Sequence, residues 1–295
     1  MEQTGLTARA SNSRLSPLLD SPYLMMMRRL AAVVLLAALA GGCGSTDTAE
    51  HAVTYQVTAK SNYEKGLKEL KDENYPEAIK YFNFVKQKFP FSKYAVLAEL
   101  RIADTQFERG HYLEAVDQYK MFGRSHPTHE LVEDGYVGFK ICEAYVKQMP
   151  DDFFLLPPSF EKDQSATRDA LREIDMFIEK WPKSKYVDKA KQYRLQAAHS
   201  LAASELYVAR FYVKKDKWRA AQWRLEGLLK EYSGTDLDPP ALLLLGQAYR
   251  HLGEPDKART TFEKLIKDHP KSKEAHSAQG ELPHVGAPQA AGTHG

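Results

Sequence analysis

The sequence predicts an all-α solenoid built from five helix pairs, about ten helices in all. The first observation behind this prediction is that five segments share an alanine and, twelve residues later, a residue that can end a helix. The alanines are Ala78, Ala115, Ala170, Ala221 and Ala258, and the matching later residues are Pro90, Pro127, Pro182, Ser233 and Pro270. The small alanine lets a neighbouring helix approach closely, and proline stops a helix at a fixed length. Internal repetition of this kind is typical of solenoids.

The second observation is a repeated pair of large apolar side chains after each alanine. Four residues after the alanine stand Phe82, Tyr119, Ile174, Leu225 and Phe262, and seven residues after it stand Val85, Phe122, Phe177, Leu228 and Leu265. Offsets of 0, 4 and 7 fall on one face of a helix. Each of the five segments is therefore predicted to form a helix with one buried face.

A partner helix is expected before each of these segments. In the fifth segment, apolar or small residues lie 16, 13, 12 and 9 positions before Ala258, namely Leu242, Leu245, Gly246 and Tyr249. This arrangement resembles the tetratricopeptide repeat, which has a small residue on its first helix and alanine and proline on its second. The first two segments lack the aromatic residue of the first helix.

The repeats are expected to form two groups, with repeats 1–3 in residues 57–184 and repeats 4–5 in residues 185–273. An insertion at residues 149–158 separates the two helices of the third repeat. The first helix of the fourth repeat is predicted from about Lys185 to Lys215, which corresponds to about 45 Å. Residues 274–295 are predicted to be disordered, because the repeat pattern stops and the segment is poor in charge and rich in glycine.

Residues 25–42 have the layout of a secretory signal peptide, with a basic start and an apolar stretch from Leu30 to Ala40. This stretch is too short for a bilayer core, which needs about 20 residues. We interpret residues 1–24, which precede three consecutive methionines, as an over-extended N-terminus.

Small residues directly before Cys43 resemble the bacterial lipobox. In a lipobox the cysteine becomes the first residue and is lipidated with acyl chains such as palmitate. We therefore predict lipidation of Cys43, with residues 43–56 as the lipidated cysteine and linker. Gly44 and Ser45 follow it, and the absence of aspartate there permits sorting to the outer membrane. The alternative is ordinary secretory cleavage that leaves Cys43 as a free thiol.

The composition excludes several classes of protein. With 43% hydrophobic and 27% charged residues the chain is not a polytopic membrane protein, and beyond residue 42 its basic and acidic residues are equal in number. No charge surplus remains there for a nucleic acid. Because no motif for metal, nucleotide or nucleophilic chemistry occurs, we predict no enzyme, no cofactor and no metal site. Cys142 is interpreted as a buried small hydrophobic residue, and Trp218 and Trp223 as packing residues.

Several segments resemble one known family. They are FPFSKYAVLAEL (89–100), DGYVGFKICEAY (134–145), WPKSKYVDKA (181–190) and, most specifically, the stretch from LAASELYVARFY to LLKEY (201–232). Over about residues 40–272 the chain resembles the BamD family, the tetratricopeptide-repeat lipoproteins of the outer-membrane β-barrel assembly machinery. The resemblance implies a lipid-anchored protein on the periplasmic side of the outer membrane of a Gram-negative bacterium. It also implies three kinds of partner: a BamA-like barrel-forming subunit, other assembly lipoproteins, and unfolded segments of outer-membrane proteins.

Two candidate surfaces follow. The N-terminal groove is assigned to first-helix residues that do not pack on the second helix, namely Tyr63, Leu67, Leu70, Leu97, Leu100, Asp104 and Phe107. The resemblance implies that this groove binds substrate or partner segments, although half of these residues would alternatively pack against the next repeat. The resemblance also implies that the C-terminal repeats dock the barrel-forming subunit, and the candidates are Glu205, Arg210, Arg219 and Arg224. Arginine is frequent at interface hot spots, and the alternative is that these four are solvated charges.

A different function remains compatible with the repeats and the lipobox. A periplasm-facing repeat lipoprotein can also serve cell-envelope maintenance, division or pilus assembly. An oligomerising coiled coil before the repeats would favour that reading, and residues 46–60 are too short for one.

Overall fold

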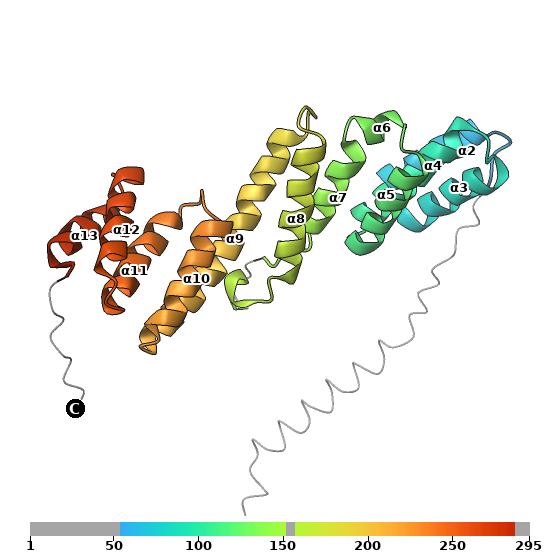
Figure 1. Ribbon diagram of the computed structural model, residues 1–295. Helices are drawn as coiled ribbons and strands as arrows, with labels where there is room; N and C mark the ends of the chain where they lie inside the picture. The colour runs from blue at the N-terminus through green and yellow to red at the C-terminus, as the bar shows by residue number, and fades with distance from the viewer. Residues whose placement is uncertain (1–53, 152–156, 287–295) are drawn as a thin grey trace, which may run out of the picture. The chain divides into compact units, whose positions relative to one another are not determined.

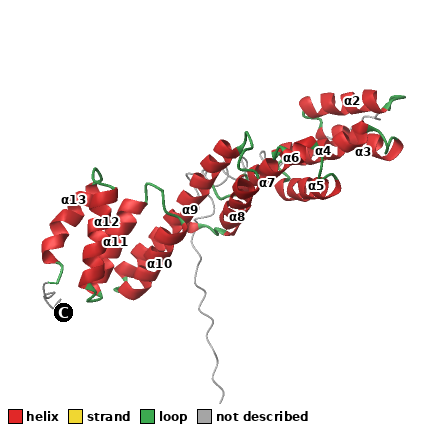
Figure 2. Ribbon diagram, turned by 45° about the horizontal axis from the view of Figure 1, so that its top comes forward, coloured by secondary structure: helices red, strands yellow, loops and turns green. Residues whose placement is uncertain are grey.

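The computed structural model describes residues 54–151 and 157–286, and these consist of helices, turns and loops (Figure 2). Ten helices form five successive pairs, and each helix packs against the next along the chain (Figure 1). The pairs are α2 (Ala59–Lys71) with α3 (Tyr75–Lys88), α4 (Lys93–Glu108) with α5 (Tyr112–Ser125), α7 (Tyr136–Val146) with α8 (Ser165–Lys180), α9 (Val187–Lys214) with α10 (Trp218–Glu231), and α11 (Asp238–His251) with α12 (Pro255–Asp268). The predicted all-α architecture of five helix pairs is confirmed.

The repeated positions form the cores of these pairs. The five alanines and the apolar residues four and seven positions after them are all buried, with exposures of 2% or less. Each pair therefore uses the helix face that the sequence pattern predicts.

Proline ends the second helix of four repeats in the same way. The residue before each proline, namely Phe89, His126, Trp181 or His269, has φ between −131° and −125° and ψ between 51° and 59°. The proline ring disfavours the α conformation of the residue before it, which accounts for the repeated geometry. In each case the backbone N–H of that residue still donates to the carbonyl four residues earlier.

The C-terminal segment differs from the prediction. Part of the range predicted to be disordered forms α13 (Lys273–Glu281) and a short 3-10 helix, η2 (Leu282–His284). Ser272 caps α13, and Ala275 and Ala278 are fully buried against the last repeat. The end of a solenoid leaves an apolar face uncovered, and a terminal helix covers it here. The prediction of disorder was therefore wrong for residues 274–286, and residues 287–295 lie outside the described residues.

The helix α9 is the longest, with 28 residues, or about 42 Å. Its N-terminal part contacts α8, where Arg194 and Asp175 form an ion pair, and its C-terminal part contacts α10 through Glu205 and Arg224. The predicted long helix is confirmed to within two residues at each end. A four-residue helix, α6 (Glu130–Glu133), and the 3-10 helix η1 (Ser159–Glu161) complete the described elements, while residues 152–156 of the insertion lie outside them.

Glycine on the first helix allows an aromatic ring of the second helix to lie directly against the backbone. A Cβ atom added at Gly246 would lie 2.3 Å from the ring of Phe262, and one added at Gly66 would lie 2.6 Å from the ring of Phe82. Both rings are fully buried. Neither ring can retreat without displacing the close-packed core around it.

Gly246→Ala is therefore expected to lower the free energy of unfolding by about 1–3 kcal/mol, the range observed for overpacked cores. The matched control is Gly227→Ala in α10, because an added Cβ there meets no atom within 4 Å. In an exposed helix interior, alanine is more favourable than glycine by about 0.8–1.0 kcal/mol, so this control should stabilise the protein. Denaturant titration of both variants checks the opposite signs, and a stabilised Gly246→Ala would contradict the packing described here.

Candidate docking surfaces

The seven candidate groove residues do not form one open surface. Tyr63, Leu100, Asp104 and Phe107 are buried, whereas Leu67, Leu70 and Leu97 are half-buried. Leu100 and Phe107 belong to the core that α4 forms with α5 and α7. These positions agree better with the alternative interpretation, in which half of the seven residues pack against the next repeat. Leu100 has no exposed surface, so it cannot contact a ligand in the groove.

Asp104 is the centre of a polar network that connects four helices. Its Oδ1 atom accepts hydrogen bonds from the hydroxyl groups of Tyr119, at 2.6 Å, and Tyr136, at 3.3 Å. Its Oδ2 atom pairs with the guanidinium group of Arg101, whose Nε donates to the Tyr63 hydroxyl at 3.3 Å. The network thus ties α2, α4, α5 and α7 together on one side of the N-terminal repeats.

Burial, and then the negative charge of Asp104, raise the pKa values of the Tyr119 and Tyr136 hydroxyl groups well above their ordinary value. Both hydroxyls therefore stay protonated and act as donors. Because three donors occupy the Asp104 carboxylate, it stabilises the fold instead of offering a free charge to a ligand. Sequence reasoning missed Arg101 and Tyr136 as its partners. The pairing of Arg101 with Asp104 could have been predicted, because residues three apart lie on the same helix face. Nothing in the sequence indicates that Tyr136 contacts Asp104.

On the C-terminal repeats, Glu205 and Arg224 do come together. Glu205 of α9 and Arg224 of α10 form an ion pair of 3.1 Å, in which the arginine side chain is about half exposed. Glu205 is half-buried, and the pair lies where the two helices meet. An exposed pair of this kind contributes little to stability, about 0–1 kcal/mol.

Arg219 lies on a different side of α10. It pairs with Glu254, at 2.7 Å, before the start of α12, and it also donates to Gln222, at 2.7 Å. The five residues that separate Arg219 and Arg224 correspond to about 140° around a helix. The two arginines therefore face different neighbours and do not form the single patch that the sequence suggested.

The two tryptophans of α10 have different environments. Trp218 stacks on His251, with ring centroids 3.8 Å apart and planes at 6°, and its N–H donates to Asp216. The packing role predicted for Trp218 is confirmed. Trp223 is 65% exposed, so it lies on the helix surface and not in the core. Trp223 directly precedes Arg224 in the sequence, and tryptophan and arginine are both enriched in interface hot spots.

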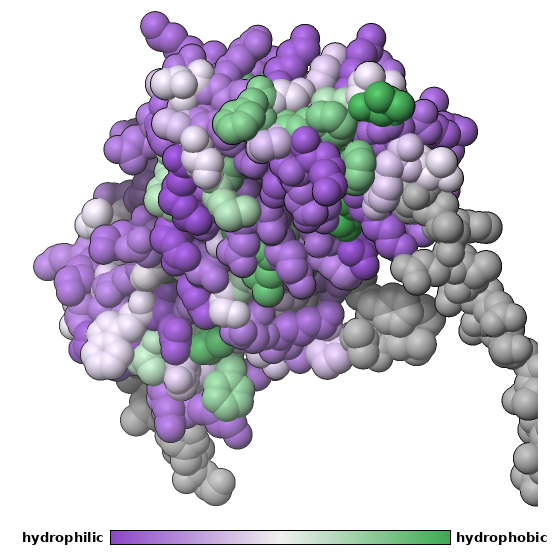
Figure 3. Space-filling view, turned by 90° about the vertical axis from the view of Figure 1, so that its right-hand side faces the viewer, coloured by the Kyte–Doolittle hydropathy of each residue, from purple (hydrophilic) through white to green (hydrophobic). Residues whose placement is uncertain are grey.

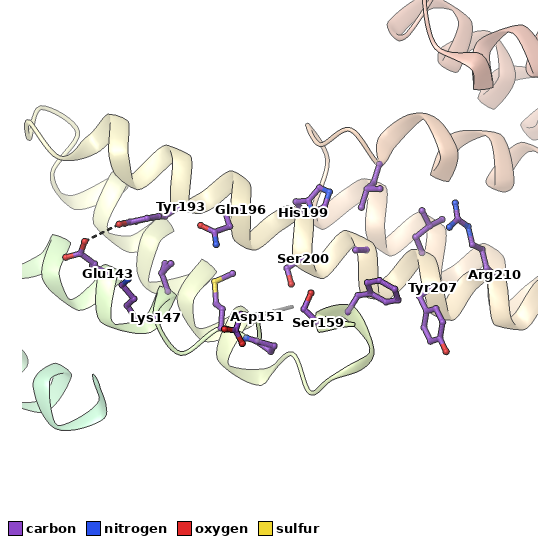
Figure 4. Close-up of a pocket in the computed structure, with 17 residues that line it drawn as sticks. Glu143, Lys147, Asp151, Ser159, Tyr193, Gln196, His199, Ser200, Tyr207 and Arg210 are labelled. Atoms are coloured by element: carbon purple, nitrogen blue, oxygen red, sulfur yellow. Dashed lines mark hydrogen bonds between the residues drawn. The ribbon is translucent and has the colours of Figure 1, made fainter. Parts of the chain in front are cut away.

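Arg210 lines a cavity of about 900 Å³ along α9 (Figure 4). In that view Arg210 and Tyr207 lie at one end, whereas Glu143 and Tyr193 lie at the other end. The Tyr193 hydroxyl donates to Glu143 at 3.1 Å, and burial and this carboxylate raise the pKa of Tyr193 to about 12. Arg210 therefore lines this cavity, which neither Glu205 nor Arg224 lines. Sequence reasoning missed the cavity because α7, the segment around η1, and α9 contribute to it from distant positions.

The described residues contain no set of three His, Cys, Asp or Glu side chains close enough to bind a metal ion. Within the same residues, every helix is too short or too polar to cross a bilayer. Cys142 is buried, as predicted, and burial raises the pKa of its thiol to about 12, which keeps it protonated and unreactive. Cys43 lies outside the described residues.

Comparison with known proteins gives consistent results. A family model described as "YfiO: Outer membrane lipoprotein" matches residues 55–265. A protein of Neisseria meningitidis named outer membrane protein assembly factor BamD is 24% identical over 253 residues, which cover 83% of this chain and 93% of that protein. A Rickettsia prowazekii protein of the same name is 28% identical over 249 residues, covering 84% and 94%. Among solved structures, the TPR2AB domain of yeast Sti1 in complex with an HSP90 peptide aligns with 77% of this chain and 84% of that one, at 16% identity and a TM-score of 0.41.

Proposed function

The chain belongs to the YfiO family of outer membrane lipoproteins, and we propose that it acts in the assembly of outer-membrane β-barrel proteins as a scaffold without catalytic activity. The observation that carries this proposal is the share of the relatives' length that this chain matches. The relatives named outer membrane protein assembly factor BamD from Neisseria meningitidis and Rickettsia prowazekii match this chain over 93% and 94% of their own length, so the match extends over most of both proteins. A role confined to division or pilus assembly has no comparable support.

The surface formed by Glu205, Trp223 and Arg224, called here the α9–α10 surface, is the proposed docking site for the barrel-forming subunit. Its support is physical: Trp223, which directly precedes Arg224 in α10, is 65% exposed, and the side chain of Arg224 is about half exposed in its ion pair with Glu205. Tryptophan supplies a large apolar contact area, and arginine can exchange its intramolecular carboxylate for one on a partner. Arg219 and Arg210 lie on neighbouring surfaces. They would contact the barrel-forming subunit only if its interface extends beyond the α9–α10 surface.

The half-buried leucines of the first two repeats, Leu67, Leu70 and Leu97, are what remains of the proposed substrate groove. Apolar side chains that are partly open to solvent suit the alternating apolar residues of an unfolded β-strand. We propose that unfolded segments of outer-membrane proteins contact this side, and other assembly lipoproteins are further proposed partners.

The lipid anchor is proposed at Cys43. Replacement by alanine should abolish incorporation of labelled palmitate and leave the protein uncleaved or detached from membranes. Several acyl chains on one residue hold a folded domain firmly, since each buried methylene contributes about 0.8 kcal/mol. The matched control is Cys142→Ala, which removes the buried thiol and should leave palmitate incorporation unchanged. Equal incorporation by wild type and Cys43→Ala would show that the anchor lies elsewhere.

The function itself is tested by isolating the lipidated protein from detergent-solubilised envelopes and identifying what copurifies. A stoichiometric barrel-forming outer-membrane subunit is the expected result. Recovery of division or pilus proteins without such a subunit would overturn the proposal.

A further inference from the structure

In the turn after the second helix of each repeat, the position thirteen residues after the repeat's alanine is exposed. In the last four repeats this position holds a polar residue or glycine, namely Thr128, Lys183, Gly234 and Lys271. In the first repeat it holds Phe91, whose side chain is fully exposed. A single exposed apolar residue is common and needs no explanation. The surroundings of Phe91 decide whether it has a role.

A row of contacting aromatic rings, Tyr55, Phe84 and Phe89, links the start of the described chain with the turn that carries Phe91. The ring of Tyr55 stacks on Phe84, with centroids 3.9 Å apart, and Phe84 contacts Phe89 at 6.1 Å. Phe91 follows Phe89 by two residues, and Val57, which is 92% exposed, follows Tyr55 by two residues. Two of the most exposed apolar side chains therefore flank the same aromatic row. Figure 3 faces this end of the molecule and shows hydrophobic side chains among hydrophilic ones.

Lysines lie next to these apolar residues. Lys86 and Lys88 are in the last turn of α3, and Lys93 is the first residue of α4, so the three bracket Phe91 in the chain. Protruding apolar side chains with ammonium groups beside them match the boundary of a phospholipid bilayer. There aromatic and aliphatic groups enter the headgroup region, and lysine meets the phosphates.

The chain length from the proposed anchor agrees with this position. Twelve residues separate Cys43 from Tyr55, and a fully extended chain of that length spans at most about 40 Å. The aromatic row therefore lies at the part of the described chain that is nearest in sequence to the membrane.

We propose that the tip carrying Val57 and Phe91 contacts the phospholipid surface of the membrane directly, as a second point of attachment beside the acyl chains. This inference rests on the proposed lipid anchor at Cys43. It assigns the first repeat a fixed orientation relative to the bilayer, with Phe91 in the headgroup region and the lysines at the phosphates.

The test uses the full lipidated protein in vesicles of phosphatidylethanolamine and phosphatidylglycerol. Phe91→Cys carries an environment-sensitive fluorophore, and Lys271→Cys, at the same turn position of the last repeat, is the matched control. Cys142 is buried with a protonated thiol and does not compete for the label. The expected result is a blue-shifted emission at position 91 that nitroxide-labelled lipids quench, with neither effect at position 271.

Four results would overturn the inference. Vesicle-bound protein without quenching at position 91 would leave the lipid anchor intact and reject the contact. Equal quenching at both positions would reject a contact specific to the first repeat, and shielding of position 91 only in the presence of a copurified protein would identify a protein contact instead. Protein that fails to float with the vesicles would reject the Cys43 anchor and, with it, the contact.

Discussion

Replacing Asp104 by alanine is expected to lower the free energy of unfolding by about 3 kcal/mol. The change leaves the buried Tyr119 hydroxyl and the Arg101 guanidinium without their acceptor. Removing one partner of a buried ion pair typically costs about 3–5 kcal/mol. The lower end applies here because about a quarter of the Arg101 side chain is exposed to solvent. Urea titration followed by circular dichroism measures the loss.

Two further variants separate the network from a general effect of losing an aspartate. Asp104→Asn removes the charge and turns one carboxylate oxygen into an NH2 donor, but it keeps one acceptor oxygen for Tyr119, so its loss should be smaller. Asp117→Ala removes an exposed aspartate from α5, and surface substitutions of this kind change stability by about 0.5 kcal/mol or less. Equal stability of Asp104→Ala and Asp117→Ala would mean that the network contributes nothing to folding.

Charge reversal at Arg224 is expected to weaken binding of the barrel-forming subunit by about 30- to 1,000-fold, which corresponds to about 2–4 kcal/mol. A glutamate at this position removes the proposed anchor and places a second carboxylate beside Glu205. Because the Glu205–Arg224 pair is partly exposed at the surface, the folded state should lose less than about 1 kcal/mol. A pull-down of the partner with purified variants, checked by circular dichroism, measures both effects.

The matched control is Arg172→Glu, which reverses an exposed arginine of α8 that pairs with Asp169 on its own helix. Its binding should equal that of the wild type. Trp223→Ala should weaken binding as Arg224→Glu does, whereas Arg219→Glu reports whether the contact extends toward α12. Full binding by folded Arg224→Glu and Trp223→Ala variants would place the docking site elsewhere.

The fold was largely predictable from the sequence because its signals are local. The alanine and its apolar partners four and seven residues later decide which helix face is buried, and all of them are buried in the structure. Proline ends a helix through its own ring and acts only on the residues around it, so the helix ends at Phe89 and Trp181 could be located without any tertiary information.

The candidate surfaces depended on contacts between distant parts of the chain. Periodicity assigned Asp104 and Leu100 to a first-helix face, yet only the stacking of α4 on α5 and α7 decided that this face was closed. Likewise, Arg219 and Arg224 are close in sequence, and the neighbours that they face, α12 and α9, separate them.

By itself the sequence determined the number of repeats and their cores, together with a family resemblance that the comparison with known proteins confirmed. The tertiary structure alone decided that α13 covers the last repeat, that Trp223 is exposed, and that Asp104 is fully engaged by hydroxyl and guanidinium donors. The physical reason is the same in each case. A helix period states which side of a helix needs a neighbour, whereas the identity of that neighbour, and the side chains that stay uncovered, depend on how the pairs stack.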